Sequence, residues 1–136
     1  MGPAEARERF AGAQVARLAS VGADGTPHVV PIVFALDGET VYSVVDSKPK
    51  RTARLRRIEN LRARPAAALL ADHYESDWSR LWWVRADGEA RVLDGSDPEA
   101  ARAVALLRKR YPQQEAAGEV LAVDVRRWSG WSAADG

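Results

Sequence analysis

Residues 28–45 read His28-Val-Val-Pro-Ile-Val-Phe-Ala-Leu-Asp-Gly-Glu-Thr-Val-Tyr-Ser-Val-Val45, two apolar runs separated by Asp37-Gly38. An Asp-Gly pair between apolar runs is a strong signal for a β-hairpin. The pattern therefore predicts strands over 28–36 and 40–45. The first run is almost wholly apolar, which predicts burial on both of its faces. Pro31 within it predicts an edge strand, a bulge or a break in pairing that faces a ligand.

Basic charge gathers directly after this hairpin. Residues 48–64 hold eight of the 20 Lys and Arg residues and one acid, Glu59, although the net charge of the whole chain is only +1. Pro49 suits the first position of a helix, with Ser47 or Lys48 as the N-cap. This helix is expected to end before Pro65.

The start of this helix is predicted to bind an anion. The unpaired N–H groups of a helix N-terminus favour phosphate or carboxylate, and nearby cations strengthen such a site. The cations here are Lys48, Lys50, Arg51 and Arg54. Arg56, Arg57, Arg62 and Arg64 are expected to be solvated, with Leu55, Ile58 and Leu61 forming an apolar stripe. Nucleic-acid binding is disfavoured, because nothing outside this segment adds to the basic charge.

The rest of the chain predicts a mainly β fold. Apolar runs indicate strands at 15–21, 66–71, 81–86, 89–93 and 120–128, with a joint or bulge at Asp87-Gly88. Helices are expected at 3–11 and from Asp97-Pro98 to Tyr111, and one helical turn near 77–80. The second long helix would present Ala101, Val104, Ala105 and Leu107 to the core. The order β-β-β-α-β-β-α-β with hairpin connections favours closure into a barrel, which removes exposed sheet edges.

Composition narrows the function classes. The 136 residues suit a single domain spanning 1–136. The absence of Cys excludes disulfides and thiolate chemistry, and two His residues are few for a metal site, so no metal is expected. No run suits a membrane span or a signal segment, which predicts a cytoplasmic protein without membrane contacts. No motif of a catalytic triad or phosphate loop is present, so no catalytic residue is assigned.

Five short motifs in this order resemble the split β-barrel flavin and deazaflavin reductases, the superfamily named after pyridoxamine 5′-phosphate oxidase. The resemblance covers roughly Phe10 to Trp131 and is nearest to the branch that uses the deazaflavin coenzyme F420. The motifs are Asp24-Gly-Thr-Pro-His-Val-Val-Pro31, Val41-Tyr-Ser-Val-Val45 followed by Lys50, Arg57-Ile-Glu-Asn-Leu-Arg-Ala-Arg-Pro65, Trp83-Val-Arg-Ala-Asp-Gly-Glu-Ala-Arg91 and Arg127-Trp-Ser-Gly-Trp131.

This resemblance implies an FMN-binding-like split barrel that forms a homodimer with a cofactor site at the subunit interface. It places Lys50 on the family's phosphate-binding lysine, with Arg51 and Arg54 near the phosphate. The strand under the cofactor ring would supply His28, Val30, Pro31 and Ile32, and the flanking strand would supply Ser43, Val44 and Val45. The implied activity is hydride transfer between F420 and a small organic substrate.

Departures from the oxidase itself bear on the cofactor. The strand His28–Leu36 lacks the Arg and Lys that hold the FMN phosphate there, and the chain lacks the oxidase's C-terminal Arg and His pair. Both departures argue against pyridoxamine phosphate oxidation and favour F420 over FMN. An FMN-binding reductase and a non-catalytic carrier of F420 or flavin are the alternatives.

The remaining conspicuous residues are expected to have packing roles more often than catalytic or binding roles. Trp82 and Trp83 are adjacent in a predicted strand and must face opposite sides, one toward the core and the other toward a partner or ligand. Trp128 and Trp131 are expected to be packing residues. Asp72-His73 with Asp77 form a weak metal or proton-relay candidate, since loop carboxylates are usually solvated.

Overall fold

The computed structural model describes the chain over residues 1–46, 51–114 and 116–135, without the side chains of 45–55 and 116–118. In chain order the elements are α1 (Pro3–Gly12), β1 (Ala16–Val21), β2 (Pro27–Ile32), β3 (Ala35–Asp37), β4 (Thr40–Asp46), α2 (Arg51–Ala63), β5 (Ala66–His73), the 3₁₀ turn η1 (Trp78–Arg80), β6 (Trp82–Leu93), α3 (Pro98–Arg110), β7 (Ala116–Ser132) and the 3₁₀ turn η2 (Ala133–Asp135). None of the helices described there is long and apolar enough to cross a membrane.

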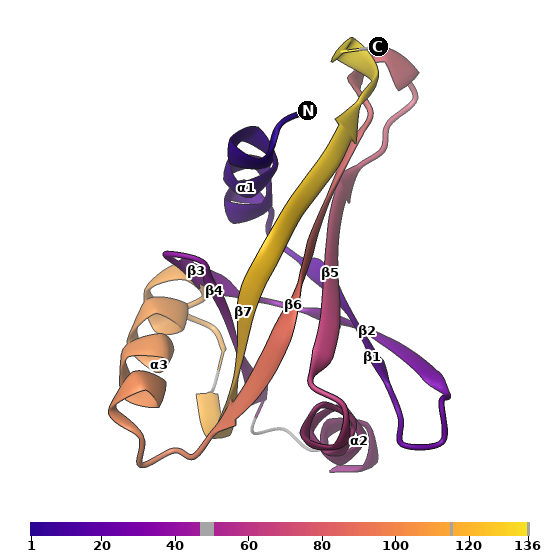
Figure 1. Cartoon of the computed structure of the whole chain (residues 1–136). Helices are drawn as coiled ribbons and strands as arrows, with labels where there is room; N and C mark the ends of the chain where they lie inside the picture. The colour runs from indigo at the N-terminus through magenta and orange to yellow at the C-terminus, as the bar shows by residue number, and fades with distance from the viewer. Residues whose placement is uncertain (47–50, 115, 136) are drawn as a thin grey trace.

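The seven strands form one antiparallel sheet in the order β2-β1-β5-β6-β7-β4-β3. Its two edge strands, β2 and β3, are consecutive in the chain and are separated only by Val33 and Phe34. The chain thus leaves one edge of the sheet and joins the other, which closes the sheet into a split barrel (Figure 1). The predicted mainly β split barrel is confirmed.

The predicted continuous strand over 28–36 is wrong in one respect, because β2 and β3 are separate strands. Pro31 lies on β2, whose position at the edge of the sheet confirms one of the three expectations for a strand proline. Burial on both faces is also wrong, because burial alternates along β2 and Val29 is 62% exposed. The apolar residues of β2 thus line the barrel on one side and lie at the surface on the other.

The barrel interior is packed with aromatic and aliphatic side chains. The ring of Phe10 from α1 lies 4.5 Å from Phe34 and 5.4 Å from Trp128, measured between ring centroids. Ile58 and Leu61 of α2 join the same core cluster, so the predicted apolar stripe is confirmed for these two residues. The helices α1 and α2 close opposite ends of the barrel (Figure 1).

The helix α3 packs on the outside of the barrel against β4. Its buried residues are Ala100, Ala103 and Leu107, which pack with Tyr42 and Val44. The predicted apolar face was right at Leu107 and at Val104, which is partly buried against the same cluster, but wrong at Ala101 and Ala105, which are exposed. Alanine occupies both faces of this helix, so hydrophobicity alone did not identify the buried one.

A polar clamp fixes α3 to the sheet, formed by Arg91, Glu99, Asp124 and Tyr42. The Arg91 guanidinium donates to both Glu99 oxygens at 2.8 Å and to Asp124 at 2.7 and 3.0 Å. Tyr42 Oη donates to Glu99 Oε2 at 2.6 Å. Hydrogen bonds from Arg91 and then Tyr42 lower the pKa of Glu99 to about 2, and burial followed by the bond to Glu99 raises the pKa of Tyr42 to about 12.

Beyond the barrel, the ends of β5, β6 and β7 continue as an arm that carries η1 and η2 (Figure 1). The strand β6 is continuous, and its register shift between Asp87 and Gly88 confirms the predicted bulge. Trp82 packs against the core cluster, whereas its neighbour Trp83 points to the outer face beside its strand partner Trp131. Trp128 is a core residue as predicted, but Trp131 is 44% exposed and does not fit a packing role within one chain.

Candidate functional site

The barrel splits between β2 and β4. β2 pairs with β1 along its whole length, and β3 pairs with β4 only from Ala35↔Tyr42 to Asp37↔Thr40. Continuing that register would place Ile32 opposite Val45, yet no pairing joins the two strands there within the part of the chain that the structure describes. The facing edges of β2 and of the second half of β4 therefore offer backbone N–H and C=O groups to a ligand.

The strand residues predicted to hold a cofactor lie on these two edges. On β2, Val30 and Ile32 face the barrel core, His28 is half-buried and Pro31 is exposed. Their contact with a cofactor stays a prediction, and it would run through the backbone edge more than through side chains.

On β4, two of the predicted residues have buried side chains. Val44 is 5% exposed and packs beneath α3, so its side chain is directed away from the barrel interior. Ser43, on the opposite face of the strand, is 4% exposed. Val45 lies on β4, but its side chain is outside the described part. For Ser43 and Val44, the backbone edge is again the accessible part.

The predicted phosphate-binding residues fall mostly outside the described part of the chain. Lys50 lies outside the described residues, as do Ser47, Lys48 and Pro49 of the predicted helix start. The backbone of Arg51 and Arg54 forms the first turns of α2, and their side chains are not described. The predicted anion site at the helix start stays a prediction.

A cleft of about 410 Å³ lies at the first residues of β2, between the turn linking β1 to β2 and the second half of α2. Asp24 fixes that turn by accepting the Thr26 N–H at 3.0 Å, which lowers the pKa of Asp24. Across the cleft lie Arg56, Glu59 and Asn60 of α2. With one cation and two carboxylates, these walls suit the polar, hydroxyl-bearing part of a ligand better than a phosphate.

His28 connects β2 with this cleft. It lines the cleft, and its Nδ1 is buried without a hydrogen-bond partner among the residues that the structure describes. A buried, unpaired polar atom costs about 1–3 kcal/mol, so a ligand that supplies its partner gains affinity. His28 is thus the predicted residue whose side chain has the clearest reason to bind a ligand.

Sequence reasoning missed most of the cleft, because it expected the arginines in the second half of α2 to be solvated and assigned no role to Asn60. That expectation is wrong for Arg57: its Nε is buried without a partner among the described residues, and burial lowers its pKa. The expectation is confirmed for Arg56, Arg62 and Arg64, which are exposed. Of these, Arg62 donates to Glu119 at 2.5 Å and Arg64 donates to the Ala23 carbonyl at 3.1 Å. The sequence spacing could have indicated the burial of Arg57, because Arg57 lies four residues before buried Leu61 and therefore on the same helix face.

The weak metal candidate at Asp72, His73 and Asp77 is not supported. Asp77 instead caps η1 by accepting the Ser79 N–H at 3.1 Å and the Ser79 hydroxyl at 2.6 Å. His73 pairs with Glu75. Within the described residues, no group of three or more potential metal ligands comes together.

Comparison with known proteins agrees with this architecture. The family model described as pyridoxamine 5′-phosphate oxidase matches residues 3–132. No curated protein matches the chain.

Three solved structures illustrate the shared fold. A conserved hypothetical protein of Mycobacterium tuberculosis is 20% identical, with a TM-score of 0.78 over 98% of this chain and 86% of that one. A FAD-binding protein of Mesorhizobium loti is 22% identical, with a TM-score of 0.73 over 96% and 94% of the two chains. The haem storage protein HutZ of Vibrio cholerae is 15% identical, with a TM-score of 0.71 over 97% and 95%.

Proposed function

The chain belongs to the pyridoxamine 5′-phosphate oxidase family, and we propose from this membership that it binds a flavin-type cofactor in the split between β2 and β4 and uses it for hydride transfer. When bound, such a cofactor supplies the redox chemistry. The protein binds and orients it and shields the reacting ring from water. This division of labour fits a chain in which no general acid or base is assigned.

The observation that carries the proposal is the pair of strand edges on β2 and β4, which lie unpaired within the described part of the chain, together with His28 Nδ1, which has no hydrogen-bond partner there. A flavin or deazaflavin ring is flat and has carbonyl and N–H groups along its edge. Backbone groups of β2 and β4 match these groups, and the cleft at the first residues of β2 has room for a hydroxylated chain. The FAD-binding neighbour of Mesorhizobium loti, with the same fold, supports a ligand of this class.

Within this class we favour F420. Residues 28–36, which include most of β2 and the start of β3, contain no Lys or Arg to hold a phosphate, so the phosphate must depend on the basic residues after β4. The resemblance to the deazaflavin branch points the same way. An FMN-dependent reductase is the alternative within the same site.

Equilibrium titration with F420, FMN and FAD, followed by quenching of Trp fluorescence, tests the cofactor. We expect F420 to bind most tightly, and His28→Ala to weaken its binding about three- to tenfold, the scale of one hydrogen bond. Tighter binding of FMN or FAD would reject F420 while keeping the flavin-type site. Failure of all three to bind would reject the proposed function.

A second assay separates an enzyme from a carrier. The same fold occurs in HutZ, which is described as a haem storage protein and not as an enzyme. If the chain is an enzyme, reduced F420 bound to it should be oxidised faster in the presence of small organic acceptors than the same concentration of free cofactor. An unchanged rate over a panel of acceptors, with tight binding, would favour the carrier.

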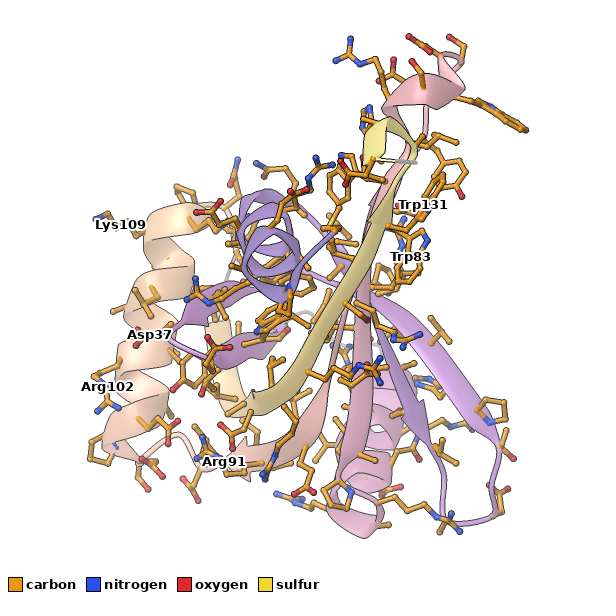
Figure 2. The ribbon with its side chains drawn as sticks, turned by 45° about the horizontal axis from the view of Figure 1, so that its top comes forward. Asp37, Trp83, Arg91, Arg102, Lys109 and Trp131 are labelled. Atoms are coloured by element: carbon orange, nitrogen blue, oxygen red, sulfur yellow. The ribbon has the colours of Figure 1, made fainter. Side chains whose placement is uncertain are left out.

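We further propose that two copies pair through the outer face of β5, β6 and β7. Trp83 and Trp131 are strand partners on this face and lie together on one side of the arm (Figure 2). Leu70 is 38% exposed on the same face, where a hollow of about 300 Å³ adjoins Trp83. Exposed aromatic and aliphatic side chains of this kind are typical of protein interfaces. Light scattering at micromolar concentration should give the mass of a dimer, and a monomer mass would reject this pairing.

A further inference from the structure

A groove on the arm has a chemistry that the proposed cofactor site does not use. It encloses about 480 Å³, and its walls include Arg9, His73, Ser79, Arg80, Trp82 and Ser132. It lies beside α1, at the end of the barrel opposite to α2 and the cleft that contains His28. Trp82 faces this groove, whereas Trp83 faces the opposite side, so the proposed dimer surface and the groove do not share a face.

The groove wall presents two guanidinium groups, each of which also contacts one carboxylate. These groups belong to Arg9 and Arg80, and no acidic residue lines the groove among the residues that the structure describes. Arg9 Nη2 contacts Glu5 at 3.2 Å, and Arg80 Nε contacts Glu75 at 3.5 Å. Each guanidinium has five N–H donors, so a single carboxylate contact leaves donors for an anion.

Two stacked aromatic rings lie next to these cations. The rings of His73 and Trp82 lie 6.2 Å apart between centroids and only 21° from parallel. The Arg9 guanidinium carbon is 5.5 Å from the centre of the Trp82 ring. A ligand ring that packs against this stacked pair would place a substituent at its edge within reach of Arg9.

The hydroxyl of Ser132 completes the polar end of the groove. Ser132 is 3% exposed, and its oxygen accepts the Ala134 N–H at 3.3 Å, which leaves the O–H proton to donate. Ser79 cannot serve in the same way, because its hydroxyl already donates to Asp77. Two guanidinium groups and one hydroxyl donor beside a flat ring together fit an aromatic ring with an anionic substituent.

We propose that this groove binds a small aromatic carboxylate, independently of the cofactor site. The carboxylate pairs with Arg9 and Arg80, and the ring lies along Trp82 and His73. The site is distinct from the split in position and in chemistry, because its cations are not those of the segment 48–64.

Titration of the ¹⁹F NMR signals of 4-fluorobenzoate and 4-fluorobenzamide with the purified protein tests this proposal. The two probes have the same ring and size and differ in charge. We expect the benzoate to bind at least fivefold more tightly, and Arg9→Gln and Arg80→Gln each to weaken it about five- to tenfold. Arg126→Gln is the matched control and should change nothing, because Arg126 is a solvated residue of β7 outside the groove.

Several outcomes would overturn the proposal. Equal binding of the two probes would show that charge plays no part, and insensitivity to both Arg9→Gln and Arg80→Gln would place the ligand elsewhere. Inorganic phosphate that competes as well as an equal concentration of benzoate would remove the role of the ring. Displacement of fluorobenzoate by F420 or FMN would make the groove part of the cofactor site, whereas unchanged binding supports an independent one.

Discussion

Replacing Arg91 with glutamine should lower the free energy of unfolding by about 2 kcal/mol at pH 7. Arg91 makes four hydrogen bonds of 2.7–3.0 Å to Glu99 and Asp124. Hydrogen bonds to charged groups contribute about 1.5–3 kcal/mol each when shielded. The Arg91 side chain is 43% exposed, however, and exposed ion pairs contribute only about 0–1 kcal/mol, so the four bonds together are reduced to about 2 kcal/mol.

The loss should depend on pH in a defined direction. The pKa of Glu99 falls from 4.5 to about 2 in the folded chain, first because Arg91 donates to it and then because Tyr42 does. A lowered carboxylate pKa stabilises the fold above the unfolded value of 4.5, and this stabilisation is lost as the pH falls toward 2. By about pH 3, more than half of the contribution of Glu99 should be gone. The stability difference between the wild type and Arg91→Gln should shrink accordingly.

Urea unfolding of the wild type and Arg91→Gln, measured from pH 7 to pH 3, provides the test. Arg126→Gln is the control, because Arg126 is 68% exposed and makes a single 3.5 Å contact with Glu89. It should change stability by less than about 0.5 kcal/mol. The reasoning is refuted if Arg91→Gln costs no more than this control at pH 7. A difference that stays constant down to pH 3 would equally show that Glu99 is not the titrating partner.

Three further predictions concern other parts of the chain. Gly88→Ala should lower the free energy of unfolding by about 1–3 kcal/mol in thermal unfolding, because an added Cβ would lie 2.2 Å from the Asp124 carbonyl oxygen. Gly12→Ala is the control and should not lower the free energy of unfolding, because an added Cβ there would have nothing within 4 Å. Equal effects of the two would exclude this steric cause. Lys50→Ala should weaken cofactor binding by about 1.5–3 kcal/mol in fluorescence titration. Lys109→Ala, on the far side of α3, is the control and should leave the affinity unchanged. A lower melting temperature with unchanged affinity would show that Lys50 has a structural role. Trp131→Glu should convert the proposed dimer to a monomer in light scattering, and an unchanged mass would place the interface elsewhere.

The hairpin at Asp37-Gly38 shows what the sequence predicts well. Gly38 has a φ of +61°, a conformation that glycine adopts readily, so the local signal determined the local structure. The bulge at Asp87-Gly88 and the helical turn after Asp77 follow from similarly local chemistry. Features of this kind depend on residues that are neighbours in the chain.

The division of β2 from β3 could not be predicted in the same way. Nothing in Val33 or Phe34 interrupts an apolar run, and the break exists because the chain must pass from one edge of the sheet to the other. The cleft around His28 depends on the same long-range arrangement, since it brings the turn after β1 against the second half of α2. The sequence predicted which two strands carry the candidate site residues. The direction of each side chain could be known only from the closed barrel.

The closure of the barrel by distant strands has a consequence for how the chain folds. β4 pairs along its length with β7, so Tyr42 lies beside Ala122, and Arg110 donates to the Phe34 carbonyl at 2.8 Å. Such non-local pairing is slow, because the entropy of closing a long loop is lost before the contacts that reward it form. During synthesis, the open edge of β4 must wait until almost the whole chain has left the ribosome. The nascent chain is therefore most prone to aggregation in this interval, and factors that cover exposed strands should raise its yield more than they raise its final stability.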